Sequence, residues 1–225
     1  ILKIYPKDKL QMEIGIQSTN HKTLEAIDRP SDIRKAIENM KMLKGFGNIK
    51  IHADLIAGLP FDDISAISKS FDDIFHVCDE LQLGFLKLLK GTKIRDQEAE
   101  YSFKYNEEAP YEVYENCFLS FDEIFLLKRI AALTERYKNS RHFINSCEYI
   151  ISFSASAFSF FKGLDKFINC NISAVSQHEA FRYLYEYSSF FIKKDINEND
   201  WDVFITGIQK DYMKCLNRKA PKNFI

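Results

Sequence analysis

The residue in this sequence that most needs a chemical explanation is Asp54, which lies within the apolar run IKIHADLIAGLP at positions 49–60. An ionised carboxylate in so apolar a strand costs several kcal/mol unless donors reach it. Asp54 must therefore accept hydrogen bonds from protein groups or from a ligand. In parallel α/β sheets and barrels ligands bind at the carboxyl ends of strands, and the turn 58–60 follows this strand directly.

Two further segments repeat this pattern of polar residues at a strand end, followed by small or turn residues. They are EIGIQS at 13–18 and LLKGT at 88–92. Alternation of apolar and polar residues predicts strands at 10–17 and 49–58, and a third strand is expected at 81–89. Cap residues and apolar residues at helical spacing predict helices at 21–27, 31–44 and 62–80 between them.

This order predicts two right-handed βαβ units and hence a parallel sheet. Three strands cannot close a barrel, so the sheet is expected to continue in a missing N-terminal part or in a partner chain. Exposed sheet edges would otherwise favour self-association. We read the start at Ile1, which is not an initiator Met, as the sign of a fragment.

The residues after Thr92 are polar and rich in tyrosine, and then become helical in pattern. Helices are expected at 120–137, 142–164, 176–193 and 200–216. The predicted fold class is α/β: a partial parallel (β/α) barrel over residues 1–95, followed by an all-α C-terminal domain over residues 96–225.

Composition excludes several classes of function. The chain has 31 basic and 32 acidic residues, so it lacks the positive field that drives nonspecific nucleic-acid binding. Its apolar runs are shorter than the roughly 20 residues of a membrane span, and we expect a cytoplasmic protein. The five cysteines form no CxxC or related metal spacing, so we assign no metal ligand.

The motifs GIQS (15–18), Arg29, DLIAGLP (54–60) and KGT (90–92) stand in the order and spacing of radical SAM enzymes. Over residues 10–89 the chain resembles the C-terminal half of their partial (β/α) barrel. It is most similar to cobalamin-binding members of the anaerobic magnesium-protoporphyrin IX monomethyl ester oxidative cyclase type, and to coproporphyrinogen dehydrogenase-like members. The helical tail, with PYEV at 110–113 and YKNS at 137–140, is similar to a C-terminal domain of unknown function found on such proteins.

The resemblance implies a role for each matching residue. Gln17 and Arg29 would hold the methionine carboxylate of S-adenosylmethionine, since a guanidinium fork matches a carboxylate. Asp54 would accept hydrogen bonds from the ribose hydroxyls. The adenine would lie between apolar groups: Ile56, Leu86 and Leu88.

The sequence departs from the family in one respect that bears on activity. Radical SAM enzymes bind a 4Fe-4S cluster through a CxxxCxxC loop, and this sequence has no such loop. The resemblance therefore implies a full-length parent that is an Fe-S oxidoreductase acting on an unknown small molecule. The magnesium-protoporphyrin name of the similar proteins does not make a porphyrin the substrate here. The parent would carry a cluster-binding domain, and whether it also carries a cobalamin-binding domain is open. The present chain is expected to be inactive and to bind no cofactor by itself.

Simpler interpretations stand beside these. Asp54 could cap the following turn or pair with a lysine, Gln17 could be a solvated strand end, and Arg29 a surface charge. His52 and Glu13 share the polar face with Asp54, and a hydrogen-bonded core role is the favoured interpretation for both. A function of another class is a non-catalytic helical module that binds a partner or closes the barrel.

Overall fold

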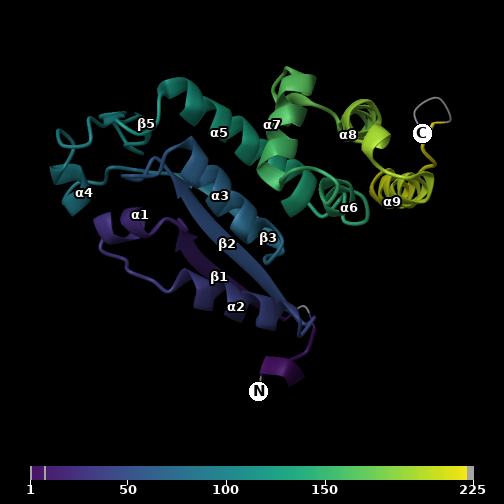
Figure 1. Ribbon diagram of the computed structural model, residues 1–225, viewed down its shortest axis with the longest axis horizontal. Coiled ribbons are helices and arrows are strands. Elements are labelled where there is room, and N and C mark those ends of the chain that lie inside the picture. The colour runs from purple at the N-terminus through teal and green to yellow at the C-terminus, as the bar shows by residue number, and fades with distance from the viewer. Residues whose placement is uncertain (1, 8, 222–225) are drawn as a thin grey trace. The chain divides into compact units, whose positions relative to one another are not determined.

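The computed structural model describes residues 2–7 and 9–221 (Figure 1). The first part contains three strands with helices between them, and a short hairpin: η1 (Leu2–Ile4), β1 (Leu10–Gln17), α1 (His21–Ala26), α2 (Ile33–Lys44), β2 (Ile49–Ala57), α3 (Ile64–Phe75), β3 (Glu80–Phe85), α4 (Lys93–Asp96), β4 (Lys104–Tyr105) and β5 (Val113–Glu115). The rest is helical: α5 (Phe121–Thr134), the π-helix η2 (Glu135–Asn139), α6 (Cys147–Ile151), α7 (Ala157–Ile168), η3 (Ile172–Ala174), α8 (Gln177–Phe191), η4 (Lys193–Asp195) and α9 (Glu198–Leu216). The predicted α/β class with a helix-rich C-terminal region is confirmed.

The main sheet is parallel, with β2 between β1 and β3. Alternation along β2 buries Ile51, Ala53 and Leu55, which are at most 2% exposed. Helices α2 and α3 both contact β2, and Figure 1 shows them flanking the strands. The alternate residues of β2, which include His52 and Asp54, point to the opposite face of the sheet.

Short polar side chains begin the helices of this layer where the sequence predicts them. Asn20, Asp32 and Asp63 are the N-cap residues of α1, α2 and α3, and each accepts a hydrogen bond from a backbone N–H of the first turn. In α3 the helical spacing of Phe71 and Ile74 places both side chains in the core at 0% exposure. Caps and apolar spacing therefore account for the helices that support the sheet.

The third strand is shorter than expected, since it ends at Phe85 and not at Leu89. The chain returns beside it: Val113 N donates to Leu86 O, and Leu88 N donates to Tyr111 O, both at 2.9 Å. The pairing partner of residues 86–88 is thus a distant segment, which local alternation does not reveal. The β4–β5 hairpin was likewise not predicted.

The single helix expected at 142–164 is wrong. Two helices, α6 and α7, occupy this region and are separated by residues 152–156. Ser156 ends the break, because its extended backbone and its side-chain hydrogen bond to Ser159 N begin a new helix. An apolar pattern that continues through both helices hides this interruption.

The chain divides into two compact units, one up to Ala131 and one from Ala132. The division falls within α5, whereas the sequence places the domain boundary at 95/96. Residues 96–131, including β4 and β5, belong by their contacts to the first unit. The domain boundary at 95/96 stays a prediction.

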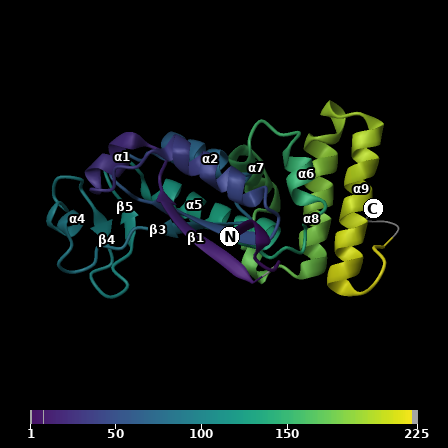
Figure 2. The same cartoon turned by 90° about the horizontal axis from the view of Figure 1, so that it is seen from below.

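The second unit is built around aromatic side chains of its helices. Tyr137, Phe161, Phe181 and Tyr212 are each at most 1% exposed. Helices α8 and α9 run side by side (Figure 2). Within the described ranges, no helix combines the length and the apolar character needed to cross a membrane.

Candidate functional site

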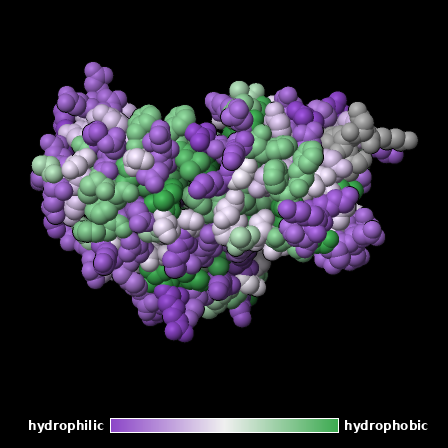
Figure 3. Space-filling model, turned by 45° about the horizontal axis from the view of Figure 1, so that its top comes forward, coloured by the Kyte–Doolittle hydropathy of each residue, from purple (hydrophilic) through white to green (hydrophobic). Residues whose placement is uncertain are grey.

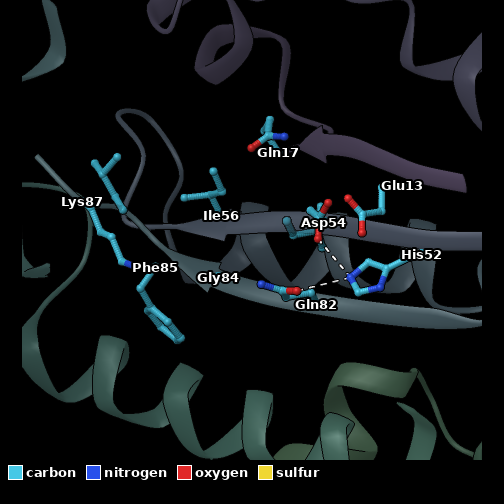
Figure 4. A pocket seen from close by; sticks show the side chains of 11 residues that line it. Glu13, Gln17, His52, Asp54, Ile56, Gln82, Gly84, Phe85 and Lys87 are labelled. Atoms are coloured by element: carbon cyan, nitrogen blue, oxygen red, sulfur yellow. Dashed lines mark hydrogen bonds and ion pairs between the residues drawn. The ribbon is translucent and has the colours of Figure 1, made fainter. Parts of the chain in front are cut away.

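A hollow of about 600 Å³ lies on the polar face of the sheet and is lined from all three strands and the segment after β3. Its lining residues are Glu13, Gln17, His52, Asp54, Leu55, Ile56, Gln82, Gly84, Phe85, Leu86 and Lys87. Figure 4 shows Glu13, His52, Asp54 and Gln82 gathered toward one end, with Phe85 and Lys87 toward the other. The hollow thus has a polar end and a more apolar end.

Asp54, at the centre of the polar end, is held by a chain of side chains across β2 and β3. Its Oδ1 lies 3.2 Å from His52 Nε2, and His52 Nδ1 lies 3.4 Å from Glu80 Oε2. Gln82 Oε1 is 3.3 Å from His52 Nε2, and Lys50 Nζ pairs with Glu80 Oε1 at 2.5 Å. The Asp54 side chain is nevertheless 33% exposed. It therefore has a protein partner and also remains open to a ligand in the hollow.

Gln17 and Arg29 come together beside Gly15. Gln17 has a φ of 67°, and the pairing of β1 with β2 shifts its register between Gly15 and Gln17. A Cβ atom on Gly15 would collide with Gln17 Nε2 and would lie 4.0 Å from Arg29 Nη2. Gly15 pairs with Asp54 across the two strands. Gly15 is thus surrounded by the Gln17 amide, the Arg29 guanidinium and the Asp54 carboxylate. Arg29 does not itself line the hollow.

The apolar residues named from the sequence lie in two different places. Ile56 and Leu86 line the hollow. Gly58 follows β2 with a φ of +94°, in the left-handed region that favours glycine. Leu88 is 0% exposed and is not part of the lining.

Several lining residues were not among the candidates from the sequence. His52 and Glu13 were weighed as core residues, but Glu13 is exposed and His52 is only half-buried. Gln82, Gly84 and Phe85 were not singled out at all, whereas Lys87 could meet a substrate carboxylate but was favoured as a solvated lysine. The signal for Gln82 and Gly84 is present in the sequence, because they alternate with the buried Leu81 and Leu83 along β3.

A second polar cluster lies under the loops that leave β1 and β2. Asp62 is 1% exposed, and burial raises the pKa of its carboxyl group from the ordinary 3.8 to about 7. Ser18 Oγ donates to Asp62 Oδ1 at 3.2 Å, which opposes the rise, and Ser18 Oγ in turn accepts from Asn20 N at 3.0 Å. Asp62 is therefore a structural link between the two loops, next to Gln17. From the sequence, Asp62 was predicted only to lie at the start of a helix.

Cysteines and other metal ligands are dispersed. Among residues 2–7 and 9–221, no group of three or more His, Cys, Asp and Glu side chains could hold a metal ion. Cys78 and Cys147 are buried, and burial raises the pKa of the Cys147 thiol far above its ordinary value. The side chains that the structure describes therefore offer no ligand set for an iron–sulfur cluster.

The fold and the site define a mixed α/β protein with a polar hollow on a three-stranded parallel sheet and a helix-rich C-terminal region. Residues 99–225 match the family described as protein of unknown function (DUF4080). The match covers more than half of the chain, which therefore belongs to this family. It begins before α5 and so includes residues of both compact units. No curated protein matches the chain.

Proposed function

We propose that this chain supplies the S-adenosylmethionine-binding half of a radical SAM oxidoreductase. The observation that carries the proposal is the convergence of Gln17, Arg29 and Asp54 around Gly15. These are the three polar residues to which the resemblance assigns the methionine carboxylate and the ribose. Their grouping was not required by the sequence pattern alone, and it supports a shared ligand.

The hollow suits such a ligand in its chemistry and size. About 600 Å³ falls within the range of roughly 300 to 1,000 Å³ typical of small-molecule sites. Arg29 and Gln17 would donate to a carboxylate, and Asp54 would accept from two hydroxyl groups. Ile56 and Leu86 would provide an apolar contact for a flat base. In radical SAM enzymes, bound S-adenosylmethionine supplies radical chemistry when an iron–sulfur cluster reduces it.

The iron–sulfur cluster does not fit the described residues of this chain, as the dispersed cysteines indicate. In this proposal the cluster belongs to another part of a cytoplasmic parent enzyme, and the chain's own residues bind and orient S-adenosylmethionine.

The first test is the affinity of the cluster-bearing parent for S-adenosylmethionine, measured by calorimetric titration. Asp54→Ala should weaken binding because it leaves the buried ribose hydroxyls without an acceptor. A hydrogen bond to a charged group contributes about 1.5 to 3 kcal/mol, so the loss should be roughly ten- to hundredfold. Arg29→Lys should also weaken binding, because an ammonium group cannot reproduce the guanidinium fork.

Asp96→Ala is the matched control, since Asp96 is an exposed carboxylate outside the hollow. It should leave the affinity unchanged, and circular dichroism should show that all variants are folded. If a folded Asp54→Ala protein binds S-adenosylmethionine as tightly as the parent does, the site assignment is wrong. If the parent does not bind it, the proposed function is wrong.

A further inference from the structure

The C-terminal end of α8 carries two large apolar side chains in solvent. Phe190 is 69% exposed and Phe191 is 52% exposed. Burying a phenylalanine side chain is favourable, so two adjacent exposed phenylalanines forgo a stabilisation. Figure 3 shows that hydrophobic and hydrophilic residues both reach the surface on one face of the molecule. Neighbouring aromatic rings extend the two phenylalanines of α8 into a larger aromatic group.

That surface is contributed by two helices. Phe167, near the end of α7, has its ring centroid 6.2 Å from that of Phe190 and 6.1 Å from that of Phe191. Tyr187, whose side chain is mostly buried, lies 5.0 Å from Phe191 and anchors the group to the core. A Cβ atom on Gly163 would collide with the Tyr187 hydroxyl, so this glycine permits the close packing. The rings are therefore fixed in place by the core.

Positive charge borders these rings. Residues 162–167 and 190–195 together contain four lysines and two aspartates. Lys166 precedes Phe167 directly and Lys194 lies just beyond Phe191, and both are exposed. Lys193 Nζ stands 5.1 Å from the centroid of the Trp201 ring. We call the group Phe167, Phe190, Phe191, Lys166 and Lys194 the Phe–Lys patch.

A second exposed phenylalanine pair in the first unit provides a contrast. Phe121 and Phe125 are 52% and 51% exposed and stack with ring centroids 6.3 Å apart. The first turn of their helix contains Asp122 and Glu123, and Lys128 and Arg129 follow in the same helix, with Arg129 stacked on Phe125. Acidic and basic residues therefore balance around Phe121 and Phe125, whereas lysines outnumber aspartates around Phe190 and Phe191. Of the two pairs, the one in the Phe–Lys patch is the better match for a negatively charged apolar surface.

We propose that the Phe–Lys patch binds an anionic lipid surface, so that the chain associates peripherally with a membrane. Exposed phenylalanines insert at the boundary between headgroups and acyl chains, and lysines are attracted to anionic headgroups. A second copy of this chain fits less well, because two basic patches would repel each other. This inference is independent of the S-adenosylmethionine site.

The test is sedimentation of the full chain with vesicles of phosphatidylcholine alone and of phosphatidylcholine with phosphatidylserine. The chain should bind only the vesicles with phosphatidylserine, and binding should fall as salt rises. Phe190→Ser combined with Phe191→Ser should weaken binding by about tenfold or more, since both inserting rings are lost. Lys166→Glu combined with Lys194→Glu should abolish the preference for phosphatidylserine.

Phe121→Ser combined with Phe125→Ser is the matched control and should bind vesicles as the unchanged chain does. The proposal is overturned if the unchanged chain does not sediment with phosphatidylserine vesicles, or if both phenylalanine pairs matter equally. It is also overturned if the Phe190 and Phe191 substitutions leave vesicle binding intact. Analytical ultracentrifugation without lipid measures self-association. If the unchanged chain self-associates but does not bind vesicles, and the Phe190 and Phe191 substitutions abolish the self-association, the patch binds a second copy and the proposal is overturned.

Discussion

At the scale of single residues, two aspartates near the carboxyl ends of the strands have opposite surroundings. Asp54 is partly exposed and faces an imidazole and the hollow, whereas Asp62 is 1% exposed under the loops. Asp54 is thus suited to meeting a ligand. Asp62 is suited to holding Ser18, and with it the loop that follows Gln17.

The pKa of Asp62, about 7 when folded and near 3.8 when unfolded, makes its contribution to stability depend on pH. A raised folded pKa means that the contribution is fully present below the unfolded pKa and is lost as pH rises through the folded pKa. The Asp62→Asn variant keeps this contribution as pH rises, because the asparagine amide does not ionise. We expect the variant to gain stability over the unchanged chain between about pH 4 and pH 7, by on the order of 4 kcal/mol at most.

Urea denaturation of both proteins across this pH range measures the difference. Asp63→Asn is the control, because Asp63 is the exposed N-cap residue of α3 and asparagine caps about as well as aspartate. A stability difference between the unchanged chain and Asp62→Asn that is constant from pH 4 to pH 8 would show that Asp62 is not buried as described.

At the scale of elements, α9 packs against the backbone of the loop that precedes α6. A Cβ atom on Gly207 would lie 2.6 Å from the carbonyl oxygen of Asn145. On the other side of this contact, Asn145 Nδ2 and Ser146 Oγ donate to the buried Asp211 carboxylate of α9, each at 2.7 Å. Glycine is therefore required in the middle of this helix by the closeness of a second backbone.

Gly207→Ala should destabilise the chain by about 1 to 3 kcal/mol, because neither backbone can move without disturbing the hydrogen bonds to Asp211. This is opposite to the roughly 1 kcal/mol that alanine gains over glycine in an exposed helix. The free energy of unfolding in urea decides between the two signs. Thr206→Ala, at the exposed neighbouring position, should stay within about 0.5 kcal/mol of the unchanged chain.

At the scale of the whole molecule, the two compact units and the family match do not share a boundary. The family match starts at residue 99, and the compact units divide at Ala131 within α5. β1 and β3 are the outer strands of the three-stranded sheet. Association of the sheet with another part of a parent, or with a second copy, stays a prediction.

Reconstitution of the isolated chain with iron and sulfide under anaerobic conditions should give no stoichiometric cluster. Cys78 and Cys147 are buried in different units, and the described residues contain no group suited to a metal. Visible absorption and iron content per chain are the measurements, with the cluster-bearing parent as the positive control. A stable cluster in the isolated chain would contradict the proposed division of labour.

The elements that depend on neighbouring residues could be predicted from the sequence. Alternation placed β1 and β2, and the caps Asn20, Asp32 and Asp63 placed the helices between the strands, because period and capping depend on neighbours in the chain. The sequence also marked Asp54 as a residue in need of a partner. The order of strands and helices then led to a parallel sheet, which is confirmed.

Which side chains meet depends on how the chain folds in three dimensions. The bulge at Gln17 and the reach of Arg29 bring both to Gly15, and the return of residues 111–113 ends β3 and leaves Leu88 buried. The burial of Asp62 likewise depends on two loops closing over it. These features come from contacts between segments far apart in the chain. A local sequence pattern therefore does not show which side chains are buried or which come together.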